Sequence, residues 1–231
     1  MKWTMGCVVL AACASTENKH HGDHGHHAHH GHHGHDGHGM THGFTDAEAW
    51  SKVFDNPERD AWQRPDEVVR QVLGGRNDLR VADVGAGTGY FTLRFAKALT
   101  HGTAIAADLE PTMLAKVMAR AQEMGLDNVG TAQASATETG LQGQVDVVFL
   151  CNTYHHLADR AAYFARLVPH LAPGGKVVIV DFVPSSKRGP PPEFKLGAAQ
   201  VDAEMADAGY ALTSHWDELP DQYLRVYQPR P

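Results

Sequence analysis

Apolar strands alternate with helical segments along most of this chain, and this alternation constrains the fold more than any other feature. Nearly unbroken apolar runs of strand length occur at residues 80–84, 103–107, 145–150 and 176–180. Strands of this kind are typical of sheets covered on both faces, because the helices that connect parallel strands pack over the sheet. The sequence therefore predicts an α/β fold with a doubly wound, mostly parallel sheet and helices on both faces.

Helical periodicity fills the segments around these strands. Pro65 suits the first turn of a helix that Gly74 and Gly75 end, and Asp46 suits the cap of an earlier helix. Further helices are expected at 91–99, 112–124, 160–171 and 200–208, with a weaker strand at 129–134 and two closing strands at 210–215 and 223–227.

Residues 1–19 have the pattern of a targeting segment. Lys2 supplies a positive charge, an apolar stretch follows, and Leu10-Ala11-Ala12-Cys13 resembles a bacterial lipobox. This pattern predicts a lipoprotein of the cell envelope with a lipid anchor through Cys13. Translation from Met40 would instead remove this segment and leave a cytoplasmic protein.

Residues 20–43 are a histidine- and glycine-rich tract without apolar periodicity, which predicts a disordered linker. Twelve of the 17 histidines lie here, and clustered imidazoles bind zinc, nickel or copper. The tract is either a metal-binding tail or a polar spacer that binds metal incidentally. The candidate ligands are His26, His27, His29, His30, His32 and His33.

Residues 44–231 are expected to form the folded domain, with residues 44–75 as lid helices ahead of the sheet. The net charge of −7 argues against a nucleic-acid partner. Arg59, Trp62 and Gln63 combine charge, aromatic surface and an amide as a lid over a ligand would. The alternative is a surface helix with Trp62 buried for packing.

A glycine-rich turn follows the first strand, in Val81–Tyr90. Gly85, Gly87 and Gly89 have no Cβ atoms, so a ligand can lie against the backbone. The spacing is GxGxG rather than the GxGxxG that binds a pyrophosphate. Asp108 ends the next strand, where a carboxylate would accept hydrogen bonds from ribose hydroxyls.

Four segments together resemble the class I S-adenosylmethionine-dependent methyltransferases. They are VADVGAGTGYF, AIAADLEPTML, DVVFLCNTYHHL and LAPGGKVVIVDF, which cover roughly residues 80–182 in the order of that family. The resemblance implies a seven-stranded sheet with a reversed last strand, and S-adenosylmethionine as the cofactor.

The resemblance also implies positions for the cofactor. Asp83 and Gly85 would lie near its methionine moiety, and Leu109 against its adenine. Many family members have an acidic residue near the adenine amino group, where this chain has Gln133-Ala134-Ser135-Ala136, so that Ser135 or a backbone group would take that place. The full set of expected cofactor-binding residues is Asp83, Gly85, Gly87, Gly89, Asp108, Leu109, Ser135 and Asn152.

Methyl transfer is an in-line displacement that requires alignment, exclusion of water and sometimes removal of a proton. The candidate catalytic residues, Tyr154 and His155, follow the fourth strand, at the sheet edge where ligands of open α/β sheets bind. A histidine can accept a proton near neutral pH. Alternatively, His155 or its neighbour His156 caps the next helix or packs under it.

The favoured function is therefore methyl transfer to a small-molecule substrate. An alternative of another class is an envelope-tethered metal- or ligand-binding protein that keeps the methyltransferase fold without catalysis. A nicotinamide-dependent oxidoreductase is disfavoured by the glycine spacing. Because a fold does not name a substrate, the methyl acceptor stays open.

Overall fold

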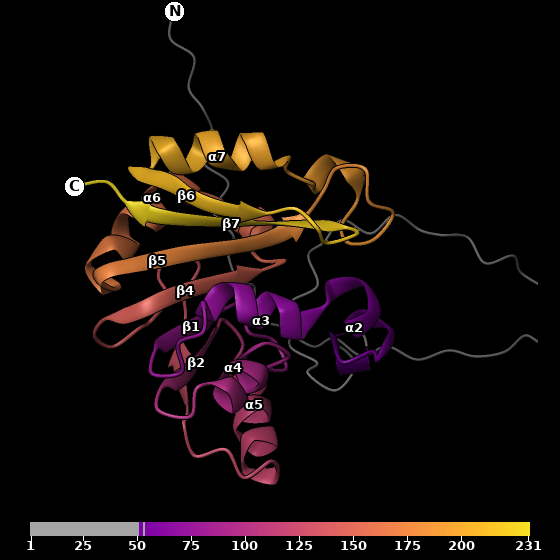
Figure 1. The fold of residues 1–231 in the computed structure, drawn as a ribbon, viewed down its shortest axis with the longest axis vertical. Coiled ribbons are helices and arrows are strands. Elements are labelled where there is room, and N and C mark those ends of the chain that lie inside the picture. The colour runs from indigo at the N-terminus through magenta and orange to yellow at the C-terminus, as the bar shows by residue number, and fades with distance from the viewer. Residues whose placement is uncertain (1–50, 53) are drawn as a thin grey trace, which may run out of the picture. The chain divides into compact units, whose positions relative to one another are not determined.

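The computed structural model describes residues 51–52 and 54–231. The predicted targeting segment, the histidine-rich linker and Asp46 lie outside the described residues. One seven-stranded sheet with the order β3-β2-β1-β4-β5-β7-β6 crosses the domain (Figure 1). Its strands are β1 (Arg80–Val84), β2 (Thr103–Asp108), β3 (Val129–Gln133), β4 (Val145–Cys151), β5 (Leu171–Phe182), β6 (Tyr210–Trp216) and β7 (Gln222–Pro229).

Strands β1 to β5 pair in parallel, whereas β7 runs antiparallel to both of its neighbours, β5 and β6. This arrangement confirms the predicted fold class, including the reversed last strand. The two closing strands form the final hairpin, since β6 pairs with β7.

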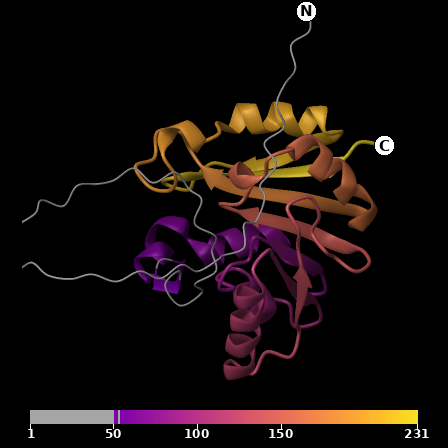
Figure 2. The ribbon, with the colours of Figure 1, turned by 180° about the vertical axis from the view of Figure 1, so that it is seen from behind.

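Helices cover both faces of the sheet. They are α2 (Glu58–Gln63), α3 (Pro65–Leu73), α4 (Thr92–Ala98), α5 (Pro111–Glu123), α6 (Arg160–Leu167) and α7 (Ala198–Asp207), with short 3-10 helices at Tyr154–His156, Val168–His170 and Pro192–Phe194. Helices α3 and α4 lie in front of the sheet in Figure 1, and α6 lies in front in the reverse view of Figure 2. No described helix combines the length and the apolar character needed to span a membrane.

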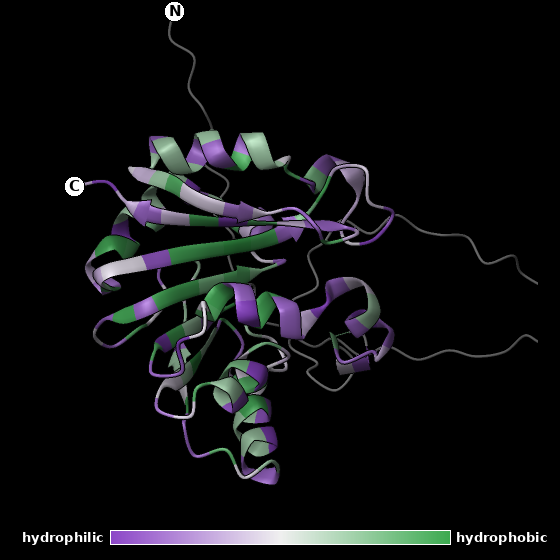
Figure 3. Cartoon of the chain, viewed as in Figure 1, coloured by the Kyte–Doolittle hydropathy of each residue, from purple (hydrophilic) through white to green (hydrophobic). Residues whose placement is uncertain are grey.

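Successive side chains along each strand point to opposite faces of the sheet, and a separate hydrophobic core lies on each face. Phe149 of β4 packs against Phe91 and Phe95 with ring centroids 4.9 Å and 5.0 Å away, on the face that α3 and α4 cover. Its neighbours Val148 and Leu150 point to the other face, in the core that α6 and α7 complete. Strands β4 and β5 are hydrophobic along most of their length in Figure 3, as strands buried on both faces must be.

The segment between α6 and β5 differs from the prediction. The helix expected through residue 171 ends at Leu167, because the ring of Pro169 prevents another α-helical turn. Strand β5 begins at Leu171 rather than at Lys176. Leu171 pairs with Val145, and the register then shifts before the next pair, so the intervening proline and glycines are accommodated as an irregularity in the ladder.

Candidate functional site

The glycine turn after β1 packs against its surroundings too closely for side chains. Gly85 and Gly87 have φ values of 72° and 53°, in the left-handed region that favours glycine. A Cβ atom on Gly85 would lie 2.3 Å from the hydroxyl oxygen of Thr153, which follows β4. A Cβ atom on Gly87 would lie 3.3 Å from the ring of Phe54. The turn therefore holds close contacts with two other segments of the chain.

Asp108 presents an oriented carboxylate beside this turn. The backbone N–H of Gly87 donates to its Oδ2 at 2.8 Å, and the N–H of Glu110 donates to its Oδ1 at 2.9 Å. The residue is buried, yet each oxygen keeps a further lone pair for another donor. Leu109, immediately after it, is 55% exposed and offers an apolar surface next to the carboxylate.

Asp83 lies beneath the turn and is only 3% exposed. Its carboxylate accepts a hydrogen bond from the hydroxyl of Thr92 in α4, at 2.6 Å. Burial raises the pKa of Asp83 to about 6, although the hydrogen bonds from Thr92 favour the charged form. The fold therefore holds a carboxylate where its ionisation is costly.

The segment after β3 lies next to Asp108 through main-chain contacts. The N–H of Ala134 donates to the Asp108 carbonyl at 2.9 Å, and the side-chain amide of Gln133 donates to the Leu109 carbonyl at 2.7 Å. The hydroxyl of Ser135 accepts from the N–H of Glu138 at 3.1 Å. The structure thus brings Ser135 to the same edge as Asp108, with its hydroxyl in a local turn.

Residues 152–156 form the next part of this edge. Asn152 has a left-handed backbone, with φ of 57°, and its side-chain oxygen accepts from the amide of Gln222 at 2.5 Å. His155 Nδ1 lies 3.0 Å and 2.9 Å from the two carboxylate oxygens of Asp181, which stands near the end of β5. Both of these side chains are buried, so β4 and β5 together position a histidine–aspartate pair.

The neighbours of His155 are engaged differently. Tyr154 is 1% exposed, stacks on Phe164 with centroids 5.6 Å apart, and donates its hydroxyl to Glu204 of α7 at 2.9 Å. The pKa of His156 is lowered by burial and by the nearby His155. Neither histidine caps α6, because the side chain of Asp159 fills that role by accepting from the Ala162 N–H at 3.1 Å.

The segment before the sheet reaches the site through α2. Gln63 is fully buried, and its amide donates to the Cys151 sulfur at 2.9 Å and to the Gln222 side-chain oxygen at 2.8 Å. The Arg59 side chain donates to the Gln63 side-chain oxygen, and its guanidinium lies 3.7 Å from the Tyr90 ring centroid. These contacts join α2 to the ends of β4 and β7.

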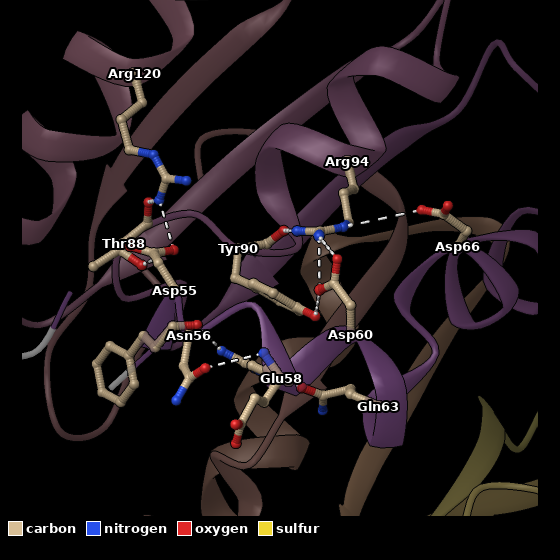
Figure 4. Close-up of polar contacts among 12 residues, drawn as sticks. Asp55, Asn56, Glu58, Asp60, Gln63, Asp66, Thr88, Tyr90, Arg94 and Arg120 are labelled. Atoms are coloured by element: carbon tan, nitrogen blue, oxygen red, sulfur yellow. Dashed lines mark hydrogen bonds and ion pairs between the residues drawn. The ribbon is translucent and has the colours of Figure 1, made fainter. Parts of the chain in front are cut away.

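Two acidic residues fasten the same segment to the glycine turn (Figure 4). Asp55 accepts from Arg120 at 2.9 Å and from the Thr88 hydroxyl at 3.0 Å. Asp60 accepts from the Tyr90 hydroxyl and, at 2.9 Å, from Arg94. The segment from Phe54 to Gln63 is therefore pinned at both of its ends beside the turn.

Trp62 of α2 is half-buried. Its ring lies 5.7 Å from that of Phe182 and 5.4 Å from the guanidinium of Arg188. The residue therefore joins α2 to the loop that follows β5.

Known proteins share both the sequence pattern and the architecture of this domain. A family model described as a methyltransferase domain matches residues 81–175. A trans-aconitate 2-methyltransferase of Deinococcus radiodurans is 31% identical over 121 residues, which cover 52% of this chain and 45% of that protein. The matched part of this chain is a class I S-adenosylmethionine-dependent methyltransferase domain.

Solved methyltransferase structures have the same fold. A SAM-dependent methyltransferase from Aquifex aeolicus superposes with a TM-score of 0.72 at 23% identity, covering 79% of this chain and 97% of that one. A magnesium protoporphyrin IX methyltransferase from Synechocystis, solved with SAH, superposes with a TM-score of 0.62 at 14% identity, covering 81% and 96%. The chain spans about half the length of the curated relatives it matches.

The matched part of the methyltransferase domain contains the glycine turn, Asp108 and His155, whereas α2 and Asp181 lie outside it. No group of three or more histidine, cysteine or acidic side chains suited to a metal ion occurs among the described residues. The predicted metal ligands of the histidine tract and the predicted anchor Cys13 lie outside that part of the chain.

Proposed function

We propose that this protein transfers a methyl group from S-adenosylmethionine to a small molecule at the carboxyl edge of its sheet. The observation that carries the proposal is the Asp108 carboxylate, which two backbone amides orient beside a glycine turn. The names of curated relatives, such as trans-aconitate 2-methyltransferase, support a small-molecule acceptor.

The residues at this edge fit the donor. The remaining lone pairs of Asp108 would accept the ribose hydroxyls, and exposed Leu109 would cover one face of the adenine. Ser135 or a neighbouring backbone group would face the adenine edge. Asp83, Gly85, Gly87, Gly89 and Asn152 would line the remainder of the donor site.

S-adenosylmethionine supplies a methyl group on a positively charged sulfur, which is already an activated leaving group. The protein then has to align the acceptor and exclude water. The segment from Phe54 to Gln63 is suited to this task, because Asp55 and Gln63 tie it to the turn and to the sheet. We therefore assign it the lid role that the sequence predicts.

The His155–Asp181 pair is suited to accept a proton from a hydroxyl or amine acceptor. With Nδ1–H donating to Asp181, the other ring nitrogen is left as the base. The Asp181 carboxylate would also stabilise the ring once it is protonated, as in other histidine–carboxylate pairs. Tyr154 is a packing residue in this scheme, since its hydroxyl is bound to Glu204.

The proposal is tested by separating donor binding from transfer. His155→Ala and Asp181→Asn should leave the affinity for S-adenosylmethionine within about threefold of wild type but lower kcat by about 10²- to 10⁴-fold, the usual contribution of a general base. Lys97→Ala, a change at an exposed side chain of α4, serves as the control. A folded wild-type protein that binds no S-adenosylmethionine would refute the proposal. Unchanged kcat in both variants would refute the assignment of the base.

A further inference from the structure

A surface hollow of about 510 Å³ lies at the carboxyl end of β5. It is lined by Val183, by residues 185–188 and by the Pro220–Asp221 step before β7. Its first lining residue, Val183, stands two positions after Asp181, the partner of His155. The hollow therefore adjoins the proposed reaction site without belonging to the donor-binding residues.

Two cationic side chains, Lys187 and Arg188, and one carboxylate, Asp221, line the hollow, although the whole chain carries a net charge of −7. Asp221 is engaged on both oxygens, by the Ser186 hydroxyl at 2.8 Å and by Arg188 Nε at 3.1 Å. Lys187 forms no hydrogen bond or ion pair with any residue that the structure describes. Lys195 does not line the hollow, but it lies nearby, because its Nζ donates to the Ser186 carbonyl at 2.7 Å.

The wall that carries these cations is held in place by its own hydrogen bonds. The N–H of Val183 donates to the Asp221 carbonyl at 3.0 Å, and the N–H of Ser186 donates to the Val183 carbonyl at 3.0 Å. The N–H of Arg188 donates to the buried Ser186 hydroxyl at 2.9 Å. These bonds order the main chain that carries Lys187 and Arg188.

The hollow also borders the lid. The guanidinium of Arg188 lies 5.4 Å from the Trp62 ring of α2, and Trp62 packs against Phe182. Figure 1 shows α2 and the loop after β5 at the same end of the sheet. A molecule seated in the hollow would thus lie beside the segment that covers the donor site.

We propose that this hollow binds an anionic group, a carboxylate or a phosphate, of the methyl acceptor. Lys187 and Arg188 are its binding residues. Arg188 uses only Nε toward Asp221, so its two terminal nitrogens are available for a two-point contact with an anion. The inference rests on the proposed methyl transfer, since it names the chemical class of that reaction's acceptor.

The test is a calorimetric titration of the full chain, first with SAH and then, with and without SAH present, with succinate, inorganic phosphate and uncharged succinamide. Wild type should bind succinate or phosphate but not succinamide. The anion that binds more tightly shows whether the hollow prefers a carboxylate or a phosphate. Lys187→Glu should weaken that binding at least tenfold. Lys97→Glu, the same charge change at an exposed lysine of α4, should change it less than twofold.

Three results would overturn the inference: no binding of either anion, equal binding of succinamide, or equal losses in the two variants. The first titration keeps this result separate from the proposed function. Binding of SAH without binding of either anion would refute only the anion site. Failure to bind SAH would refute the proposed methyl transfer itself.

Discussion

Replacing Asp83 by asparagine tests how strongly the fold penalises its buried carboxylate. The side chain is 3% exposed, and its carboxylate accepts a hydrogen bond from the Thr92 hydroxyl at 2.6 Å. Asparagine keeps the size of the side chain and an oxygen that can accept from Thr92, but it removes the charge. The substitution therefore isolates the cost of ionisation from the cost of lost packing.

The magnitude follows from the pKa. Burial raises the pKa of Asp83 from 3.8 to about 6, which corresponds to about 3 kcal/mol between the two ionisation states. The unfolded chain ionises this residue near pH 4, whereas the folded protein ionises it near pH 6. As the pH rises through this interval, wild type should lose up to about 3 kcal/mol of unfolding free energy that Asp83→Asn keeps. The difference should be constant above about pH 7.

Urea unfolding of both proteins between pH 4 and pH 8 measures this difference. The new amide donor of asparagine adds an offset that does not depend on pH, so the slope between pH 4 and pH 6 carries the test. A difference that stays flat across this interval, or that shrinks as the pH rises, would refute the reasoning. Thr92→Val is a useful companion, because loss of its hydroxyl should raise the pKa of Asp83 further.

The remaining predictions concern the core, the lid and the thiol. Phe149→Ala should lower the unfolding free energy by about 3–5 kcal/mol in urea, because it leaves a cavity among Phe91 and Phe95; a loss under 1 kcal/mol would contradict that packing. Asp55→Ala should speed amide hydrogen exchange in residues 54–63 but not in β4; unchanged exchange would show that the Arg120 contact does not hold the segment. Cys151 should resist alkylation at pH 8 in the folded protein, since burial raises its pKa to about 12; rapid labelling of its peptide would contradict this.

The parts of the site that the sequence predicts are those that depend on neighbouring residues. A strand, a glycine turn and a helix follow one another along the chain, and Asp108 ends the very next strand, so their proximity follows from the order of the elements. The sequence also predicts helix α3 with its observed ends, because Pro65 and Gly74 mark the two ends locally.

The parts that the sequence did not predict depend on partners far apart in the chain. The carboxylate that pairs with His155 comes from Asp181, 26 residues later, through the pairing of β4 with β5. Gln63 reaches Cys151 and Gln222 over 88 and 159 residues. A buried polar contact of this kind leaves no local pattern, because only the folded sheet brings its members together. The early start of β5 is a further case. Its proline and glycines are unfavourable in a strand, and the pairing with β4 accommodates them through a register shift.

Calorimetric titration of the full chain with S-adenosylmethionine, repeated with Asp108→Ala, tests the central claim most directly. Wild type should bind with micromolar affinity. If the Asp108 carboxylate accepts two ribose hydrogen bonds, as proposed, its loss should weaken binding by roughly 100-fold. Asp127→Ala, at an exposed carboxylate, should bind as wild type does. A folded wild-type protein that shows no binding, or an Asp108→Ala variant that matches wild type, would contradict the account.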